Sequence, residues 1–156
     1  MNNKILAYTD GACKDNPNGV GGWAFMVVDK KLREPIIKVS GAQMPTTNNR
    51  MELTAILKCL QYFKEPKKIT IISDSRYAIN CTIEWIHAWK QRNWIKSDGS
   101  EVMNSDILEQ IYPLVLFHEV SMHWVRGHSG DKCNEMVDEM AQNEIRSFKT
   151  STSPEK

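Results

Sequence analysis

Two aspartates stand where predicted strands end. Asp10 closes an apolar stretch over residues 4–9, and Asp74 follows the isoleucine-rich stretch 68–73. The carboxyl ends of strands are the places where open sheets flanked by helices gather their ligand chemistry. Both carboxylates are therefore candidates for a binding or catalytic site.

Two further acids occupy helix faces that should be buried. Asp138 borders an apolar stripe, because Ala141 and Ile145 lie one and two turns further along the same predicted helix. Glu52 shares its face with the apolar residues at i+3, i+4, i+7 and i+11, which are Ala55, Ile56, Cys59 and Phe63. A buried carboxylate needs a hydrogen-bonding partner, an opposite charge or a metal ion.

Each acid alone has a structural explanation, such as a helix cap, an ion pair or, for Asp10 before Gly11, a turn. Four acids at strand ends and on inward helix faces together predict one shared site. Clustered carboxylates favour a hard cation with oxygen ligands, which means Mg²⁺ or Mn²⁺ rather than zinc. Because Mg²⁺ usually binds substrate phosphates as well, often as a pair of ions, the pattern predicts phosphoryl chemistry.

The elements that would position these acids follow from the spacing of the apolar residues. Strands are predicted over 4–9, 22–28, 34–41, 68–73 and 119–125. Helices are predicted over 49–63, 77–89 and 132–148, and from Asn104 onward. Pro113 should end or kink the helix that starts at Asn104. The first three strands form an antiparallel meander, and the whole order predicts an α/β fold with a mixed sheet covered by helices.

Length and composition indicate one ordinary globular unit. The 156 residues fit a single domain with one core, and we expect this domain over 1–149 with a flexible polar tail over 150–156. Hydrophobic residues at 41% and charged residues at 25% exclude disordered, collagen-like and coiled-coil classes. The longest purely apolar run, 114–117, is far below the roughly 18 residues of a membrane span.

The charge balance, the N-terminal residues and the cysteines indicate the kind of partner, the location and the state of the thiols. Twenty basic against 19 acidic residues give a net charge of +1, so a polyanionic partner must be met by local patches. The first residues lack the pattern of a signal peptide, and we expect a cytoplasmic protein. The widely spaced Cys13, Cys59, Cys81 and Cys133 are expected to be small buried hydrophobes rather than disulfides or zinc ligands.

Four short strings resemble type 1 ribonuclease H, in the order and spacing of that family. The resemblance runs from about residue 4 to about residue 147, and the segment 85–94 with its three tryptophans is similar to the extra handle of the bacterial form. The strings are YTDGA at 8–12, TTNNRMEL at 46–53, SDSRY at 73–77, and GHSG at 127–130 followed by Asn134 and Asp138. Together they are highly specific, although each alone would be weak.

The resemblance implies a ribonuclease H-like fold, with a five-stranded mixed sheet of three antiparallel and two parallel strands flanked by helices. It implies an endonuclease that hydrolyses the RNA strand of RNA/DNA hybrids and leaves 3′-hydroxyl and 5′-phosphate ends. The family's metal ligands correspond to Asp10, Glu52, Asp74 and Asp138, which would hold two Mg²⁺ ions, or Mn²⁺ as a substitute, that activate a water against an RNA phosphate.

The same resemblance gives His128 the role of a proton shuttle. His128 lies between Gly127 and the pair Ser129 and Gly130, a flexible setting in which an imidazole can move a proton to or from a leaving group. Most lone histidines are structural or solvated. No comparable motif surrounds the other histidines, which are His87, His118 and His123.

Residues for substrate recognition also follow from the resemblance. Asn16 and Asn48, with Arg76 beside them, would contact sugar hydroxyls or base edges, although turn and helix-cap roles also fit the two asparagines. The groove for the DNA strand would contain Thr47, Trp85 and Asn104. Asn134 is counted with the substrate-binding residues, whereas Trp89, one turn from Trp85, is expected in the core.

Two departures from the family concern substrate affinity. Pro45 stands where many relatives place an arginine, and Leu108 replaces a tryptophan. Both differences predict weaker hybrid binding and leave the metal site untouched. Three alternatives are a hybrid-binding module without activity, the catalytic core of a recombinase or transposase, and the nuclease domain of a reverse transcriptase. The four acids and His128 argue against the first, and the short chain argues against the second. Met1 and the handle segment favour a free-standing enzyme over the third, and we expect a monomer.

Overall fold

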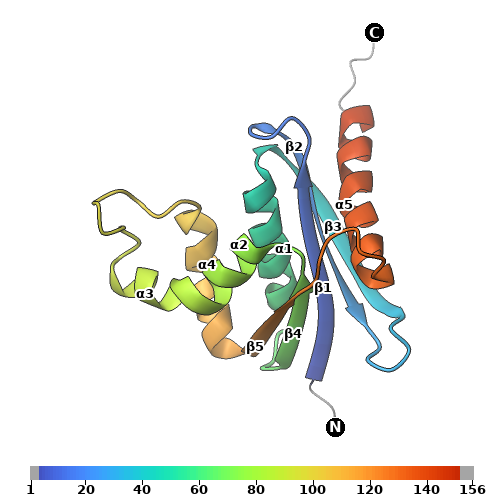
Figure 1. The fold of residues 1–156 in the computed structure, drawn as a ribbon, viewed down its shortest axis with the longest axis horizontal. Helices are drawn as coiled ribbons and strands as arrows, with labels where there is room; N and C mark the ends of the chain where they lie inside the picture. Colours follow the sequence, from blue (N-terminus) through green and yellow to red (C-terminus); the bar gives the residue numbers. More distant parts are fainter. Residues whose placement is uncertain (1–3, 152–156) are drawn as a thin grey trace.

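The computed structural model describes residues 4–151, with side chains through residue 148. Five strands form one mixed sheet in the order β3-β2-β1-β4-β5 (Figure 1). They are β1 (Lys4–Cys13), β2 (Gly19–Val28), β3 (Pro35–Thr46), β4 (Lys68–Ser73) and β5 (Glu119–Trp124). The first three strands are antiparallel, and β4 pairs in parallel with both β1 and β5. This topology confirms the predicted fold class.

Helices cover both faces of the sheet (Figure 1). One face carries α1 and α4, which pack on each other, and the opposite face carries α5, which packs on β1, β2 and β3. The helical segments are α1 (Asn48–Tyr62), α2 (Arg76–Ile79), the π-helical turn η1 (Asn80–Trp85), α3 (Ile86–Gln91), α4 (Ser105–Phe117) and α5 (Lys132–Ser151). Of the described helices, none is both long and apolar enough to cross a membrane.

Alternate residues of β1 serve two separate cores. Ala7 belongs to the core under α1, whereas Leu6 and Tyr8 belong to the core under α5. Because side chains alternate along a strand, Asp10 lies on the same face as Leu6 and Tyr8. Strand β2, between β3 and β1, is buried along its whole length, since helices cover it on both sides.

Several boundaries differ from the sequence-based expectation. The segment expected as one helix over 77–89 consists of α2, η1 and α3, because a π-helical turn interrupts it. The prediction that the helix ends at Pro113 is wrong, since α4 continues to Phe117. Proline removes only one N–H donor, Pro113 is exposed, and buried Leu108 and Ile111 anchor the helix.

The structure also bears on the expected C-terminal tail and on the expected state of the cysteines. The last helix includes Thr150 and Ser151, the first two residues of the expected tail, and residues 152–156 lie outside the described residues. All four cysteines are free thiols, of which three are buried and Cys13 is half-buried. The expectation of buried thiols without disulfides therefore holds, with Cys13 as the most accessible.

Candidate active site

Glu52 is held against β1 by the start of α1. The Thr47 hydroxyl caps α1, because it accepts a hydrogen bond of 3.1 Å from the backbone N–H of Arg50. The helix then passes so close to β1 that a Cβ on Gly11 would lie 2.3 Å from the carbonyl carbon of Met51. Glycine permits this approach, and the Gly11 backbone N–H donates a hydrogen bond to the Glu52 carboxylate.

Three carboxylates converge where β4 ends beside β1. Asp10 was expected at the end of its strand, but β1 continues to Cys13 because residues 10–13 pair with β2, so Asp10 lies within the strand. One oxygen each from Asp10, Glu52 and Asp74 lies within 4.8 Å of the other two. Asp10 and Glu52 are buried, and Asp74 is half-buried. Asp138, half-buried on α5, adjoins this group, because its charge raises the pKa of all three. The fold therefore gathers the four acids that the sequence singled out from two strands and two helices.

Burial dominates the electrostatics of this cluster. Removal from water raises the pKa of Asp10 to about 10, and the charges of Glu52 and Asp74 contribute to this rise. Burial also raises the pKa of Glu52 well above its ordinary range. The pKa of Asp74 is raised by burial too, although a hydrogen bond with the Asn134 side chain opposes the rise. Such a cluster retains protons unless a positive charge compensates it.

The donor set fits a hard divalent cation. The candidate ligand atoms are all carboxylate oxygens, the type that Mg²⁺ and Mn²⁺ prefer. One of them, Glu52 Oε1, is buried without a hydrogen-bond partner among the described residues. A buried acceptor that lacks a donor is expensive unless another ligand satisfies it. The residues that would hold such cations are Asp10, Glu52, Asp74 and Asp138.

The stability of the metal-free protein should fall as the pH rises, and a bound cation should counteract this fall. Carboxyl groups of an unfolded chain ionise near pH 4, whereas Asp10 in the fold ionises at about 10. The folded metal-free protein therefore holds extra protons across this window, and its stability falls as the pH rises. Thermal melts in EDTA between about pH 5 and pH 9 should show a falling Tm, and Mg²⁺ should raise the Tm most at high pH.

A matched series with NaCl in place of MgCl₂, at equal ionic strength, separates binding from general screening. A Tm in EDTA that stays constant or rises with pH, or an equal effect of NaCl and MgCl₂, would contradict a cation site in this cluster.

The loop between β5 and α5 lies directly against Asp74. A Cβ on Gly127 would lie 3.0 Å from Asp74 Oδ2, and the adjacent His128 lowers the pKa of Asp74 through its charge. His128 is exposed and has a φ of 57°, in the left-handed region. Its imidazole thus stands on the solvent side of the buried carboxylates, where a substrate can reach it.

Asn134, expected among the substrate-binding residues, is buried beside Asp74. Its side chain is only 2% exposed, and it hydrogen bonds to Asp74. Its backbone N–H donates a hydrogen bond of 2.9 Å to Asp131 Oδ1 at the start of α5. The structure therefore makes Asn134 a positioning residue for Asp74.

Four residues with predicted substrate contacts line one groove at the starts of α1 and α4. The groove has a volume of about 730 Å³. The residues are Asn16, Thr47, Asn48 and Asn104. The Asn16 side chain accepts a hydrogen bond of 3.0 Å from the backbone N–H of Asn48, which fixes the loop between β1 and β2 against α1. Turn and capping roles thus coexist with a place in the groove.

Two further residues of this groove were not singled out from the sequence. Arg50 donates two hydrogen bonds to the Asp106 carboxylate, at 2.6 and 3.0 Å, and one of 3.2 Å to Asn104 Oδ1. Tyr77 accepts a hydrogen bond of 2.8 Å from the Asn104 amide. Asn104, which has a left-handed φ of 65°, is therefore held from both sides. Both missed residues belong to the strings that carry the resemblance.

Arg76 and Trp85 lie outside the lining of this groove. The Arg76 guanidinium lies 3.9 Å from the centre of the Trp124 ring, and the Trp124 indole donates a hydrogen bond of 3.2 Å to the Asp74 carbonyl. No motif had pointed to Trp124. Trp85 is 40% exposed, and its ring centre lies 5.5 Å from that of Trp89, which is half-buried against the core.

Comparison with protein families and curated proteins gives consistent similarities. The family model described as RNase H matches residues 2–146. The ribonuclease H of Francisella philomiragia is 44% identical over 147 residues, which cover 92% of this chain and 91% of that protein. The ribonuclease H of Thiobacillus denitrificans is 42% identical over 137 residues, covering 88% of this chain and 90% of that protein.

Solved structures show the same architecture. LC9-RNase H1, a type 1 RNase H with the type 2 active-site motif, has a TM-score of 0.81 at 25% identity, covering 94% of this chain and 74% of that one. The foamy viral protease-reverse transcriptase in complex with RNA/DNA hybrid has a TM-score of 0.81 at 13% identity and covers 92% of this chain and 20% of that one. The second similarity concerns the fold alone.

Proposed function

Because the chain belongs to the ribonuclease H family, which degrades RNA in RNA/DNA hybrids, we propose that it cuts the RNA strand by two-metal-ion catalysis. The products would be 3′-hydroxyl and 5′-phosphate ends. The observation that carries this proposal is the cluster of Asp10, Glu52 and Asp74, with oxygens within 4.8 Å of one another. Two Mg²⁺ ions, or Mn²⁺ as a substitute, would polarise the attacking water and stabilise charge on the leaving oxygen.

The chain itself supplies fixed orientation of the ligand oxygens. The Gly11 N–H holds the Glu52 carboxylate, and the Asn134 amide holds Asp74. Asp10 is only 3% exposed, so its side chain has little freedom to turn away. Partners of this kind fix ligand orientation before the substrate arrives.

We assign His128 the movement of the proton. Hydrolysis breaks the bond between phosphorus and the 3′ oxygen of the preceding nucleotide, and this oxygen must gain a proton. His128 is exposed next to Asp74 and is followed by Ser129 and Gly130. An imidazole in this position can carry a proton between the leaving oxygen and solvent.

Discrimination between the strands would use the groove and its surroundings. Asn16 and Asn48 present amide groups that can hydrogen bond to RNA sugar hydroxyls or base edges. Thr47 and Asn104, in the same groove, and the exposed ring of Trp85 would contact the DNA strand. A flat indole packs on a deoxyribose, whereas an added hydroxyl would obstruct it. Arg76, stacked on Trp124 beside Asp74, would lie close to the cut strand.

The proposal extends to assembly and location. All four candidate ligands come from one chain, so no second copy is required to complete the site, which supports a monomer. Four free thiols suit a reducing compartment, which supports a cytoplasmic location.

The test is cleavage of a hybrid labelled on its RNA strand. Cleavage should occur with Mg²⁺ and stop with EDTA, and the labelled fragments should carry 3′-hydroxyl and 5′-phosphate ends. Single-stranded RNA and double-stranded DNA of the same sequence are the control substrates. Cleavage that persists in EDTA would remove the metal-ion mechanism, and equal cleavage of double-stranded DNA would remove the assigned substrate.

A further inference from the structure

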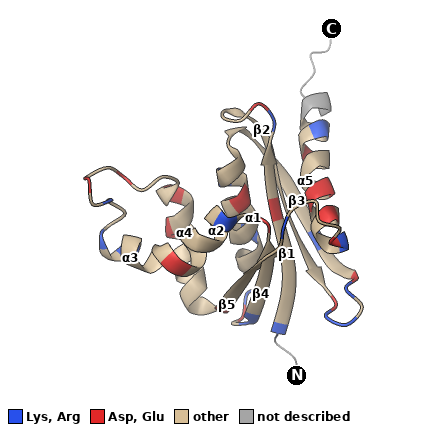
Figure 2. Cartoon of the chain, in the orientation of Figure 1, with Lys and Arg blue, Asp and Glu red and all other residues tan. Residues whose placement is uncertain are grey.

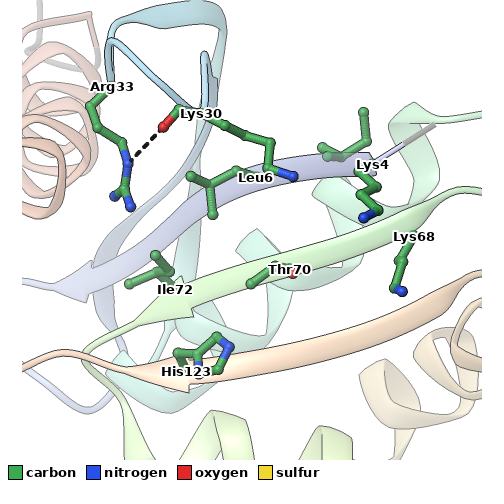
Figure 3. A pocket seen from close by; sticks show the side chains of 9 residues that line it. Lys4, Leu6, Lys30, Arg33, Lys68, Thr70, Ile72 and His123 are labelled. Atoms are coloured by element: carbon green, nitrogen blue, oxygen red, sulfur yellow. Dashed lines mark hydrogen bonds between the residues drawn. The ribbon is translucent and has the colours of Figure 1, made fainter. Parts of the chain in front are cut away.

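A second cavity lies on the sheet face that carries Asp10, toward the beginning of β1 and β4. Its volume is about 410 Å³, within the range of ligand pockets. Figure 3 shows Leu6, Thr70, Ile72 and His123 side by side on β1, β4 and β5 as its floor. Lys30 and Arg33 reach in from the loop between β2 and β3. The predicted mechanism uses none of these residues.

The cavity has a strong positive charge. Nine residues line it, and none of them is an Asp or Glu. Four of the nine are cations, which are Lys4, Lys30, Arg33 and Lys68. Outside the lining, Glu119 approaches Lys68 at 3.7 Å, but both side chains are more than half exposed and the pair is weak. In a chain with a net charge of +1, this is a local basic patch rather than part of a general excess.

Basic side chains gather at the cavity, although two acids occur in the same loop. Figure 2 shows blue at the start of β1 and blue mixed with red in the loop between β2 and β3, which carries Asp29 and Glu34, and further red segments along β1, α1 and α5. The cavity is therefore close to the acidic cluster without overlapping it. A polyanion that contacts the cavity and also reaches cations held by the acidic cluster would need to extend along the sheet.

One cation is held in place between the cavity and the carboxylates. Arg33 donates a hydrogen bond of 2.7 Å to the hydroxyl of Tyr8, which is 1% exposed, and another of 3.3 Å to the Lys30 carbonyl. Tyr8 lies two residues before Asp10 on the same face of β1, a step of about 7 Å at the usual rise of a strand. Asp131 also acts on Tyr8 through its charge, from the side of α5.

We propose that this cavity binds backbone phosphates of the RNA strand beyond the hydrolysed linkage. The inference rests on the proposed function, which places one RNA phosphate at the carboxylates. Leu6 lies four residues before Asp10, about 13 Å along β1, a length that a few nucleotides of the same strand span. The apolar side chains of Leu6 and Ile72 suit the sugars, and the surrounding cations suit the phosphates.

The position of the cavity favours the RNA strand over the DNA strand. The groove lined by Asn16, Thr47, Asn48 and Asn104 lies at the starts of α1 and α4, on the opposite face of the sheet. The acidic cluster shares α1 with the groove through Glu52, and on the side of the cavity it shares β1 through Asp10 and adjoins β4 through Asp74. A hybrid that places its DNA strand at the groove and its RNA strand on the carboxylates would present only the RNA strand to the cavity.

Two double variants with the same change in charge test the proposal. Lys30→Glu/Lys68→Glu reverses two charges of the cavity, and Lys31→Glu/Lys64→Glu reverses two exposed lysines outside it. At about 0.1 M salt the first variant should raise KM for a hybrid at least about tenfold more than the second, with kcat unchanged. Its slope of log affinity against log salt should be shallower by about 0.9 for each lost phosphate contact.

Direct binding separates this proposal from the proposed function. Fluorescence anisotropy of a labelled hybrid in EDTA measures binding without any cleavage. The difference in affinity between the two double variants then reports the contribution of the cavity. If the wild type cuts hybrids but both double variants bind and cleave alike, the cavity proposal is overturned and the activity stands. If the wild type does not cut hybrids, the proposed function fails whatever the binding shows. Perturbation of the His123 ring signals by inorganic phosphate but not by the hybrid would overturn the cavity proposal as well.

Discussion

Replacement of Asp10 by asparagine should lower hybrid cleavage by at least about a thousandfold and raise the Tm of the metal-free protein. Stabilisation by a bound metal ion is worth several kcal/mol, and a loss of about 4 kcal/mol in transition-state stabilisation corresponds to that factor. Asp10 is buried with a pKa raised to about 10, because burial and the charges of Glu52 and Asp74 disfavour its ionised form. Asparagine has nearly the same shape and no ionisable group, so the metal-free fold no longer has to hold a proton on residue 10.

The two opposite effects distinguish a metal ligand from a structural acid. The rate is measured under single-turnover conditions in Mg²⁺, and the Tm is measured in EDTA at about pH 8, where Asp10 is ionised in the unfolded chain but still protonated in the fold. Asp98→Asn makes the same change of charge in an exposed loop and should alter neither value substantially. Cleavage by Asp10→Asn at the wild-type rate, or a lower Tm in EDTA, would contradict the assigned role.

Replacement of His128 by asparagine should lower kcat by about a hundredfold while KM stays near the wild-type value. General acid and base groups typically contribute factors of this size or more. Asparagine is the appropriate replacement because residue 128 has a left-handed φ of 57°, which asparagine adopts more readily than alanine. The variant therefore removes the imidazole and leaves the loop beside Asp74 in place.

The pH dependence of the rate shows whether the lost group moves a proton. In the wild type, one limb of the profile of kcat against pH should report the imidazole, and this limb should be absent in His128→Asn. Added imidazole should restore part of the rate. His87→Asn, at an exposed histidine that packs edge-on against Tyr112, is the control and should keep the full rate. An unchanged kcat in His128→Asn would show that the proton follows another route.

Local patterns were sufficient to predict the element order and the four acids. The isoleucine alternation before Asp74 and the helical spacing around Glu52 each specify the direction of a side chain relative to its own element. The structure has strands and helices in the predicted order, and Glu52 lies on a buried face as its spacing requires. Such information is local, because the period of a strand or helix depends on neighbouring residues in the chain.

Local patterns failed where packing outweighs propensity. Pro113 indicates an end of a helix, but the buried residues before it keep α4 intact to Phe117. The segment over 77–89 has a helical spacing throughout, and nothing in that spacing indicates the π-helical turn within it. The resemblance places Asn134 among the substrate contacts. In the fold its side chain is buried and hydrogen bonds to Asp74 instead.

The sequence by itself determined which side chains are the candidates for the chemistry, namely carboxylates at or near strand ends and on inward helix faces and a histidine flanked by glycines. Only the tertiary structure decided which of them meet. Asn16 and Asn104 share a groove although they are far apart in the chain, and Arg33 bonds to Tyr8 beside a cavity that no motif indicated. The physical reason is that periodicity sets the direction of a side chain, whereas strand order and helix packing set its neighbours.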